Sequence, residues 1–376
     1  DQEIVSGNYK IYTNLDIDIQ KKMEEELLNN ISDEKMQMAS IVVEPNTGKI
    51  IALSGGRNYN KSQYNRAISA KRQVGSTMKP ILYYGALNNG MTSSSTFLSQ
   101  YTTFNLSNGK TYSPKNYGNI YGNKEITMAA AIAYSDNIYA VKTNIFLGVD
   151  KLINTAKQIG IKEKLQNVAS LALGTSELNM LDFATGYTTF ASGGYKKDLY
   201  FIEKIIDKND KIIYKHEKTN DLVLNPNYVY ILNEVLTSTT SSSFIDYNTP
   251  TALNIASKLK RKYAFKTGTT DSDYWAVGYN KDLLTIMWAG YDDNSNIALK
   301  VGMEVKNAWA NLVSYIQDDE KNSWYEIPNN VVGLMLNSIT GKPSSDSKNM
   351  TMFYYLKGSE PEYEVSKYKK KEDTTS

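Results

Sequence analysis

The sequence contains no cysteine and only one histidine among its 376 residues. The absence of cysteine excludes disulfide bonds, thiolate nucleophiles and cysteine-ligated metal sites. A Ser-His-Asp triad would have to use His216, and a metal site built from several histidines is not possible. His216 itself follows a polar, strand-like segment, so we expect it to be a surface side chain. Mechanisms that depend on thiol, imidazole or bound metal are therefore disfavoured.

Long apolar runs and an excess of one charge are also missing. No stretch of 18 apolar residues occurs, so the sequence contains no candidate transmembrane helix. The net charge is only +2, whereas a dedicated nucleic-acid-binding protein usually carries a strong basic excess. The first residues lack the features of a signal peptide. We therefore expect a soluble globular fragment of a longer protein that does not bind nucleic acid.

The pattern of apolar residues predicts strands towards both ends of the chain and helices in the middle. Residues 39–54 read as a β-hairpin around the turn sequence Pro-Asn-Thr-Gly, and further strands are predicted between 263 and 289. From 76 to 236 the patterns are mainly helical. We expect the two groups of strands to form one sheet with the helical region inserted between them. This arrangement is an α+β fold.

Capping residues and periodicity place individual elements within this outline. A short strand at 9–12 precedes a helix that ends near Leu28 and is capped by Asp16 or Asp18. Further helices are predicted at 126–134, at 150–159 with Asp150 as the cap, at 181–190 and at 307–316.

Ser76 begins the first of three candidate catalytic motifs. The pattern Ser-x-x-Lys occurs six times, but only at Ser76 does a glycine precede it and a proline follow its lysine. Proline is tolerated in the first turn of a helix and is costly further in, so Pro80 indicates a helix that begins close to Ser76. Ser76 and Lys79 would then share one face of that helix. Free backbone amides at the helix start would lie near the serine, where an oxyanion could develop.

Two further motifs follow in sequence. Ser135-Asp136-Asn137 comes after a run of small apolar residues, and Lys266-Thr267-Gly268-Thr269-Thr270 contains the only Lys-Thr-Gly of the chain. Taken alone, the first is consistent with a capped helix break and the second with a strand that ends in a turn. Gly268 would also allow a ligand to approach the backbone closely. Together, the three motifs describe a site in which a serine is activated by lysine rather than by histidine.

The motifs, their order and their spacing resemble the transpeptidase domain of a class A (bifunctional) penicillin-binding protein. The spacing is 59 residues from Ser76 to Ser135 and 131 residues from Ser135 to Lys266. The likeness extends from about residue 9 to residue 361 and includes the segments 10–16, 43–49, 64–67, 72–80, 171–177, 188–194 and 273–279. It implies the penicillin-binding-protein/β-lactamase-like fold, with an antiparallel sheet built from both chain ends, flanking helices and an inserted, mainly helical subdomain. The implied divisions are a linker with a lead-in strand and helix (1–36), the transpeptidase domain (37–341) and a C-terminal extension and tail (342–376).

The resemblance also implies a role for each motif residue. Ser76 would attack the donor peptide, and Lys79 would take its proton; to do so, Lys79 must be neutral, and we expect burial and the charge of Lys266 to lower its pKa. Ser135 would relay a proton to the leaving amine, and Asn137 would orient Lys79 and bind the substrate backbone. The implied substrate-binding residues are Thr267, Gly268, Thr269 and Thr270. Of these, Thr267 and Thr269 would bind the terminal carboxylate, aided by the catalytic Lys266. The implied oxyanion hole uses the backbone amides of Ser76 and Thr269.

The implied reaction is serine D,D-transpeptidation. A D-Ala-D-Ala stem peptide of peptidoglycan would acylate Ser76, an amine of a second stem peptide would resolve the acyl-enzyme, and β-lactam antibiotics would mimic the donor. The resemblance implies no cofactor, no metal and no nucleic-acid partner. It places the protein at the extracytoplasmic face of the bacterial cell membrane. Membrane contact would come only through an N-terminal anchor missing from this chain, and a glycosyltransferase domain would precede this region in the full-length protein.

Two other classes of function are compatible with the motifs. A serine β-lactamase or D,D-carboxypeptidase would hydrolyse the acyl-enzyme; Ser176-Glu177-Leu178-Asn179 superficially resembles the glutamate loop of class A β-lactamases, although Glu177 heads an apparently helical stretch. A β-lactam sensor or inactive scaffold would need no turnover. The intact set of catalytic residues disfavours an inactive scaffold, and no signalling partner is evident for a sensor.

Overall fold

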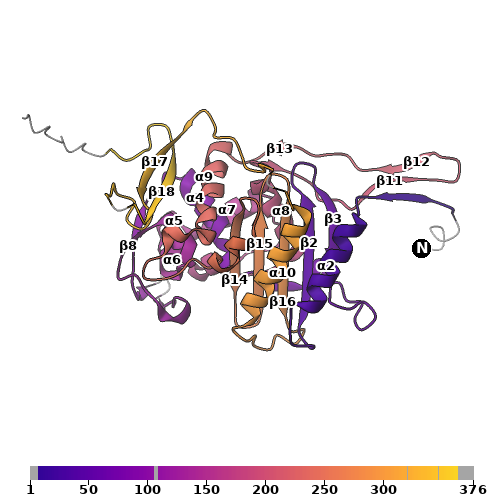
Figure 1. The fold of residues 1–376 in the computed structure, drawn as a ribbon, viewed down its shortest axis with the longest axis horizontal. Helices are drawn as coiled ribbons and strands as arrows, with labels where there is room; N and C mark the ends of the chain where they lie inside the picture. The colour runs from indigo at the N-terminus through magenta and orange to yellow at the C-terminus, as the bar shows by residue number, and fades with distance from the viewer. Residues whose placement is uncertain (1–6, 106–108, 320, 346, 363–376) are drawn as a thin grey trace, which may run out of the picture.

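An antiparallel five-stranded sheet forms the centre of the molecule (Figure 1). The computed structural model describes residues 7–105, 109–319, 321–345 and 347–362. The strand order is β14-β15-β16-β2-β3, and the strands span Gln37–Glu44 (β2), Lys49–Ser54 (β3), Ala264–Thr269 (β14), Asp273–Tyr279 (β15) and Leu284–Gly290 (β16). The early hairpin joins the late strands because β2 pairs with β16 from Val43↔Leu284 to Gln37↔Gly290. The predicted sheet built from both ends of the chain is thus confirmed.

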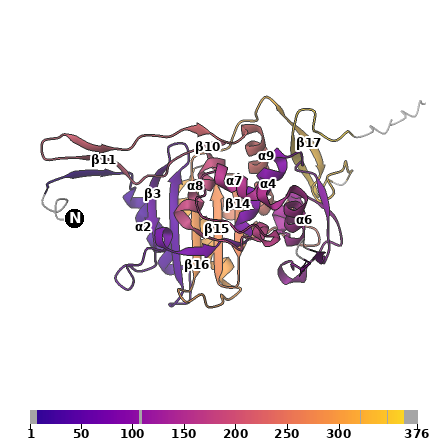
Figure 2. The same cartoon turned by 180° about the vertical axis from the view of Figure 1, so that it is seen from behind.

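Helices cover both faces of this sheet. On one face lie α2 (Ile17–Asn29) and α10 (Val301–Ile316), which run in front of the strands in Figure 1. On the other face, seen in Figure 2, lies α8 (Met180–Ala191) with the helical region behind it. Every residue of β15 and β16 is buried as a result. This double cover explains why both strands read as continuous apolar runs rather than as alternating patterns.

The helical region inserted between β3 and β14 is built around α4 (Lys79–Asn88), of which only the last residue is not buried. It contains α3 (Arg66–Ser69), α5 (Met128–Tyr134), α6 (Asn137–Leu147), α7 (Val149–Gln158), α8 and α9 (Pro226–Leu236). Short 3₁₀ helices complete it: η1 (Gly75–Met78), η2 (Tyr117–Asn119), η3 (Ala169–Leu173), η4 (Thr237–Thr240), η5 (Ser242–Phe244) and η6 (Leu253–Lys258). A helix that is apolar all round, like α4, forms only where neighbours bury every face.

Small two-stranded antiparallel sheets lie outside the central sheet. The pairs are β4 (Lys71–Gln73) with β9 (Glu177–Asn179), β5 (Thr96–Ser99) with β8 (Lys124–Thr127), β6 (Phe104–Asn105) with β7 (Thr111–Tyr112), β10 (Tyr195–Lys196) with β13 (Asp221–Leu222), and β17 (Val331–Asn337) with β18 (Met350–Leu356). The β17–β18 hairpin crosses the domain boundary that we expected at residue 341. That boundary stays a prediction, and residues 363–376 of the expected tail lie outside the described residues.

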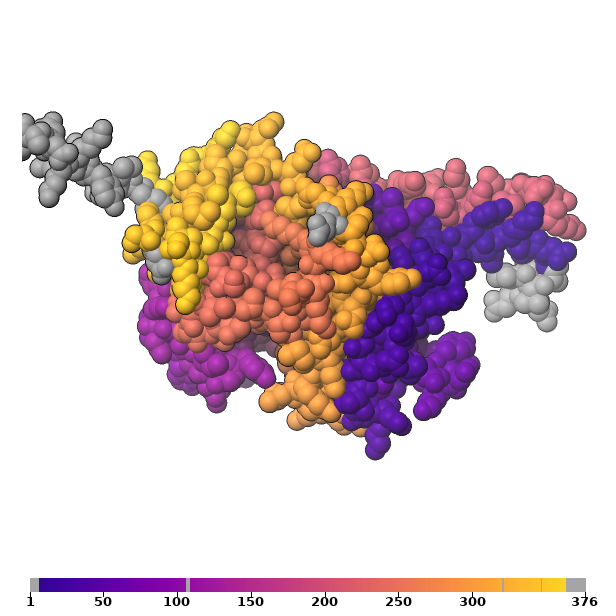
Figure 3. Space-filling view, in the orientation of Figure 1, coloured from indigo at the N-terminus to yellow at the C-terminus, as the bar shows by residue number. Residues whose placement is uncertain are grey.

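A three-stranded arm projects from the body beside α2 and β3 (Figures 1 and 3). It consists of β1 (Lys10–Thr13), β11 (Ile202–Ile206) and β12 (Ile212–Lys215). The lead-in strand therefore pairs with a hairpin nearly 200 residues away in sequence, from Lys10↔Ile206 to Thr13↔Ile202. His216 follows β12, and its ring stacks on Tyr200 with 3.6 Å between the ring centroids. The ring is thus half-buried, and not the free surface side chain that we expected.

Two helix starts differ from the predictions. The helix predicted at 150–159 begins at Val149 and has Gly148, with φ of 87°, at its N-cap; Asp150 lies in the first turn and does not cap it. The helix predicted from residue 307 begins six residues earlier, at Val301. Glycine is a poor helix former, so Gly302 obscured this start in the sequence. In the structure, Gly302 leaves room for Tyr274, because a Cβ atom there would lie 2.7 Å from the tyrosine ring.

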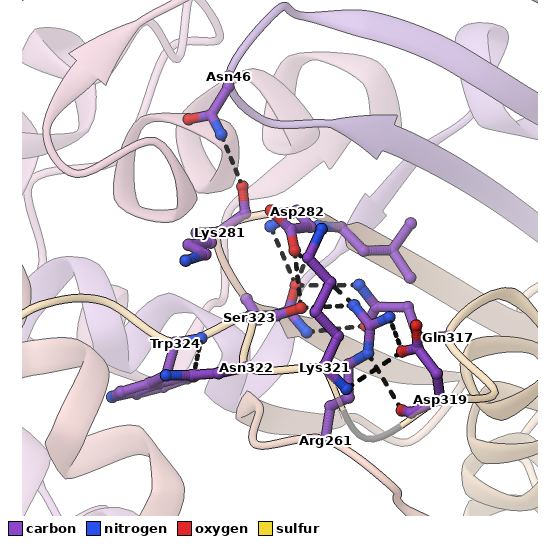
Figure 4. Close-up of polar contacts among 12 residues, drawn as sticks. Asn46, Arg261, Lys281, Asp282, Gln317, Asp319, Lys321, Asn322, Ser323 and Trp324 are labelled. Atoms are coloured by element: carbon purple, nitrogen blue, oxygen red, sulfur yellow. Dashed lines mark hydrogen bonds and ion pairs between the residues drawn. The ribbon is translucent and has the colours of Figure 1, made fainter.

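The chain that follows α10 is fastened to the end of the sheet by polar contacts (Figure 4). Arg261, just before β14, donates hydrogen bonds to Asp319 and Ser323. The hydroxyl of Ser323 donates in turn to Asp282 Oδ2, in the β15–β16 turn, at 2.7 Å. These contacts hold the end of α10 against the sheet.

Candidate active site

Ser76 lies in the 3₁₀ helix η1, which continues directly into α4. Pro80 occupies the first turn of α4, so the helix start predicted from the sequence is confirmed. Ser76 is half-buried, whereas the side chain of Lys79 is fully buried. In the described part of the chain, the Ser76 hydroxyl makes no hydrogen bond. Catalytic hydrogen bonds often form only when a substrate binds, so a missing bond between Ser76 and Lys79 is compatible with Lys79 as the base.

Three glycines hold the serine segment between two other stretches of backbone. A Cβ atom at Gly268 would lie 2.3 Å from the Val74 carbonyl oxygen, and one at Gly174 would lie 2.0 Å from that of Gly75. Gly75 and Gly174 also have φ of 57° and 71°, where side chains are strained. The close approach expected at Gly268 therefore exists, but its immediate partner is the nucleophile's own backbone. Gly174 was not singled out from the sequence, because one glycine among 23 carries no signal of its neighbours.

Ser135 stands between the two lysines. Lys79 Nζ donates to the Ser135 carbonyl oxygen at 2.7 Å and contacts its hydroxyl at 3.3 Å. Lys266 Nζ donates to the same hydroxyl at 2.9 Å and to the Thr267 carbonyl oxygen at 2.7 Å. Ser135 ends α5 in the left-handed conformation, with φ of 58°. With this uncommon backbone, the hydroxyl of Ser135 contacts the side-chain nitrogens of both lysines. The structure thus brings together the three motifs that the sequence separates.

Burial and mutual repulsion set the charges of the two lysines. Burial lowers the pKa of Lys79 to about 7, and the carboxylate of Asp136 opposes this shift. Burial and the positive charge of Lys79 hold the pKa of Lys266 well below its usual range. The predicted proximity is therefore confirmed. With a pKa of about 7, Lys79 is partly a neutral amine near neutral pH and can act as a base.

A buried network that the sequence did not reveal orients Asn137. Asn137 Oδ1 accepts a hydrogen bond from Lys79 Nζ at 2.7 Å. The backbone amide of Asn137 donates to Asn116 Oδ1 at 2.7 Å, and Asn116 Nδ2 donates to Asp136 Oδ2 at 2.7 Å. Asp136 also accepts from the Ser99 hydroxyl and caps α6 through the amide of Tyr139. Asn116 thus bridges consecutive residues of the second motif from a loop 20 residues away, and no local pattern marks it.

A cleft of about 750 Å³ opens over these groups. The predicted site residues on its wall are Ser76, Ser135, Asn137, Thr267, Thr269 and Thr270. Lys79, Lys266 and Gly268 are buried beneath them. The backbone of Thr269 adjoins that of Gly75, since a Cβ atom on Gly75 would lie 2.9 Å from the Thr269 nitrogen. The two amides expected to form the oxyanion hole therefore belong to neighbouring segments.

Glu177, the residue considered for a hydrolytic mechanism, lies outside the cleft. Glu177 begins strand β9 and pairs with Gln73, so the helical context expected for it is wrong; helix α8 starts only at Met180. Glu177 is exposed and does not line the cleft.

The described residues contain no cluster of three or more acidic or histidine side chains able to hold a metal ion. Among the same residues, no helix has both the length and the apolar character needed to cross a bilayer.

The fold and the site together define a class of protein, the penicillin-recognising serine enzymes. The fold has a sheet built from both chain ends with a helical region inserted between them, and in the site Ser135 lies between two buried lysines. Comparison with known proteins identifies the family. The sequence model of the penicillin binding protein transpeptidase domain matches residues 38–315. Penicillin-binding protein 2D of Bacillus subtilis is 36% identical over 366 residues, which cover 96% of this chain and 53% of that protein. The chain belongs to the penicillin-binding protein transpeptidase family, and the resemblance stated from its motifs is confirmed.

Solved structures agree on the fold. Penicillin-binding protein 1A of Haemophilus influenzae superposes with a TM-score of 0.85 at 19% identity, over 95% of this chain and 73% of that one. The PonA1 protein of Mycobacterium tuberculosis, in complex with penicillin V, gives a TM-score of 0.72 at 19% identity, over 87% of this chain and 93% of that one. The chain spans about half the length of the curated relatives it matches.

Proposed function

We propose that this chain is a serine D,D-transpeptidase that cross-links peptidoglycan stem peptides through an acyl-enzyme on Ser76. The observation that carries the proposal is the Ser135 hydroxyl, which contacts two buried lysines at the floor of a cleft that Ser76 also lines. A serine hydroxyl is a weak nucleophile unless a base removes its proton. With its pKa lowered to about 7, Lys79 is available as that base near neutral pH.

In the acylation step, Ser76 Oγ attacks the carbonyl carbon of the penultimate D-alanine while Lys79 Nζ takes the hydroxyl proton. The amides of Ser76 and Thr269 would stabilise the oxyanion. The C–N bond to the terminal D-alanine then breaks. Ser135 gives its proton to the leaving amine and regains one from Lys79. The products are free D-alanine and a Ser76 ester.

In the second step, an amine of another stem peptide attacks this ester. The amine loses a proton to the neutral Lys79, the ester C–O bond breaks and Ser76 Oγ regains a proton. A new amide bond joins the two peptides. Asn137 would hold both Lys79 and the substrate backbone, and Thr267, Thr269 and Thr270 would bind the donor. A β-lactam would follow the first step and stop at the ester.

Hydrolysis is the alternative outcome for the same ester. A β-lactamase or D,D-carboxypeptidase needs a group that activates water against the acyl-enzyme. The carboxylates on the cleft wall are Asp136 and Asp271. Asp136 already accepts hydrogen bonds from Ser99 and Asn116, and Asp271 is exposed. Neither position favours water activation, which supports transfer rather than hydrolysis.

We also propose the setting of the full-length protein. The family acts on peptidoglycan, which lies outside the cytoplasmic membrane. An extracytoplasmic location, an N-terminal membrane anchor and a preceding glycosyltransferase domain follow from the class A resemblance. The length of the relatives, about twice the matched span, leaves room for both additions.

The decisive experiment compares the parental protein with Ser76→Ala. Intact mass spectrometry after incubation with fluorescent penicillin should show one adduct on the parental protein and none on the variant. Circular dichroism checks that the variant is folded. A labelled D-Ala-D-Ala peptide with an amine acceptor then separates transfer from hydrolysis. Labelling of a folded Ser76→Ala protein would exclude Ser76 as the nucleophile.

A further inference from the structure

The cleft continues beyond the catalytic serine to the first turns of α10. Its wall there includes Tyr274, Gly302, Met303 and Lys306. Gly302 lets the Tyr274 ring pack closely against the helix, and Lys306 follows four residues later on the same face of α10. The Tyr274 hydroxyl in turn interacts with the side chain of Thr267. A continuous wall therefore links the threonines of β14 to Lys306.

Lys306 has only neutral partners. Its Nζ donates to the Thr251 carbonyl oxygen and to Asn254 Oδ1, both at 2.7 Å. No carboxylate forms an ion pair with it in the part of the chain that the structure describes, although Asp271 also lines the cleft. An ammonium group has three donors, so one is left for a ligand. Burial lowers the pKa of Lys306 to about 8, as expected for a cation without an anionic partner.

Lys266 already donates hydrogen bonds within the protein. Its Nζ donates hydrogen bonds to the Ser135 hydroxyl and to the Thr267 carbonyl oxygen, and burial and the charge of Lys79 hold its pKa well below the usual range. The threonine hydroxyls offer hydrogen bonds but no charge. A carboxylate binds most strongly where a charged donor reaches it. In this cleft, Lys306 is the cation on the same wall as the threonines.

We propose that Lys306 is a specificity-determining residue that recognises the free terminal carboxylate of the acyl donor, a peptide or a β-lactam. This inference rests on the proposed function. It assigns to α10 the selection of donors that end in a carboxylate, while β14 supplies the hydrogen bonds.

The test compares penicillin G with its methyl ester, which lacks the negative charge. Second-order acylation rates are measured by intact mass spectrometry. Lys306→Met should slow acylation by penicillin G by about tenfold to a hundredfold, the range of a charged hydrogen bond, and change the rate with the ester less than about twofold. Lys306→Arg, which keeps the charge, should recover most of the loss. The matched control is Lys115→Met, which removes one charge from the same cleft and should leave the preference for the acid intact.

Several outcomes would overturn the inference. Equal slowing with acid and ester would mean that Lys306 shapes the cleft rather than binding the carboxylate. Equal effects of Lys306→Met and Lys115→Met would mean a general electrostatic effect. If the parental protein is not acylated at all, the proposed function fails, and a binding experiment still tests Lys306. Ser76→Ala protein should bind acetyl-D-Ala-D-Ala more tightly than its C-terminal amide in NMR titrations, and this difference should disappear when Lys306→Met is added.

Discussion

Replacement of Gly174 by alanine should displace the nucleophile without touching any group that reacts. Gly174 has φ of 71°, and a Cβ atom there would lie 2.0 Å from the Gly75 carbonyl oxygen and 2.5 Å from the Gly75 nitrogen. Real Cβ atoms do not approach backbone atoms so closely. The segment that carries Ser76 would have to move by more than about 1 Å to reach ordinary van der Waals distance, which begins at 3.4 Å.

Gly193 provides a matched control. Its φ of 75° is nearly the same, but a Cβ atom there has nothing within 4 Å. Gly193→Ala should therefore cost only the strain of the left-handed backbone, about 1–2 kcal/mol, and leave acylation unchanged. Gly174→Ala should lose the same amount of stability to backbone strain, and in addition the free energy needed to displace the Gly75 backbone. A shift of about 1 Å in a reacting group reduces the rate by about a hundredfold.

The assay combines urea unfolding with the rate of acylation by fluorescent penicillin. We expect both variants to lose stability, and only Gly174→Ala to lose its acylation rate while it is still folded. If Gly174→Ala acylates at the parental rate and is as stable as Gly193→Ala, the close contact between Gly174 and the Gly75 backbone does not position Ser76.

Three further predictions concern the chemistry. Acylation should rise with pH through about 7 as Lys79 loses its proton, and Lys79→Ala should slow it by several powers of ten; a flat pH–rate profile would point to another base. Asn116→Ala should slow acylation by about tenfold to a hundredfold and alter its pH profile, because the amide of Asn137 loses its acceptor; a loss of stability with an unchanged pH profile would indicate a merely structural role. The penicillin adduct on Ser76 should persist for many minutes in mass spectra, since neither carboxylate that the structure describes on the cleft wall, Asp136 or Asp271, is placed to activate water; rapid return of the unmodified mass with consumption of drug would identify a β-lactamase.

The sequence predicted the elements of this site better than their relations in space. Pro80 fixed the helix start at Ser76, and the apolar runs of β15 and β16 indicated strands. Both signals are local, because they depend on backbone conformation and on the periodicity of burial. Asn116 and Gly174 were not predicted, since their partners lie about 20 and 100 residues away. Their importance comes from contacts that only the folded chain creates.

The pKa values of Lys79 and Lys266 also depend on contacts that only the folded chain creates. From the motifs, we expected burial and the charge of Lys266 to lower the pKa of Lys79. In the structure, burial lowers the pKa of Lys79 to about 7, and burial and the charge of Lys79 hold the pKa of Lys266 well below its usual range. A lysine with a lowered pKa suits proton transfer through Ser135 but is a weaker partner for a donor carboxylate. The division of labour that we propose, with buried lysines for proton transfer and Lys306 for charge recognition, would separate two tasks that favour opposite charge states of a lysine.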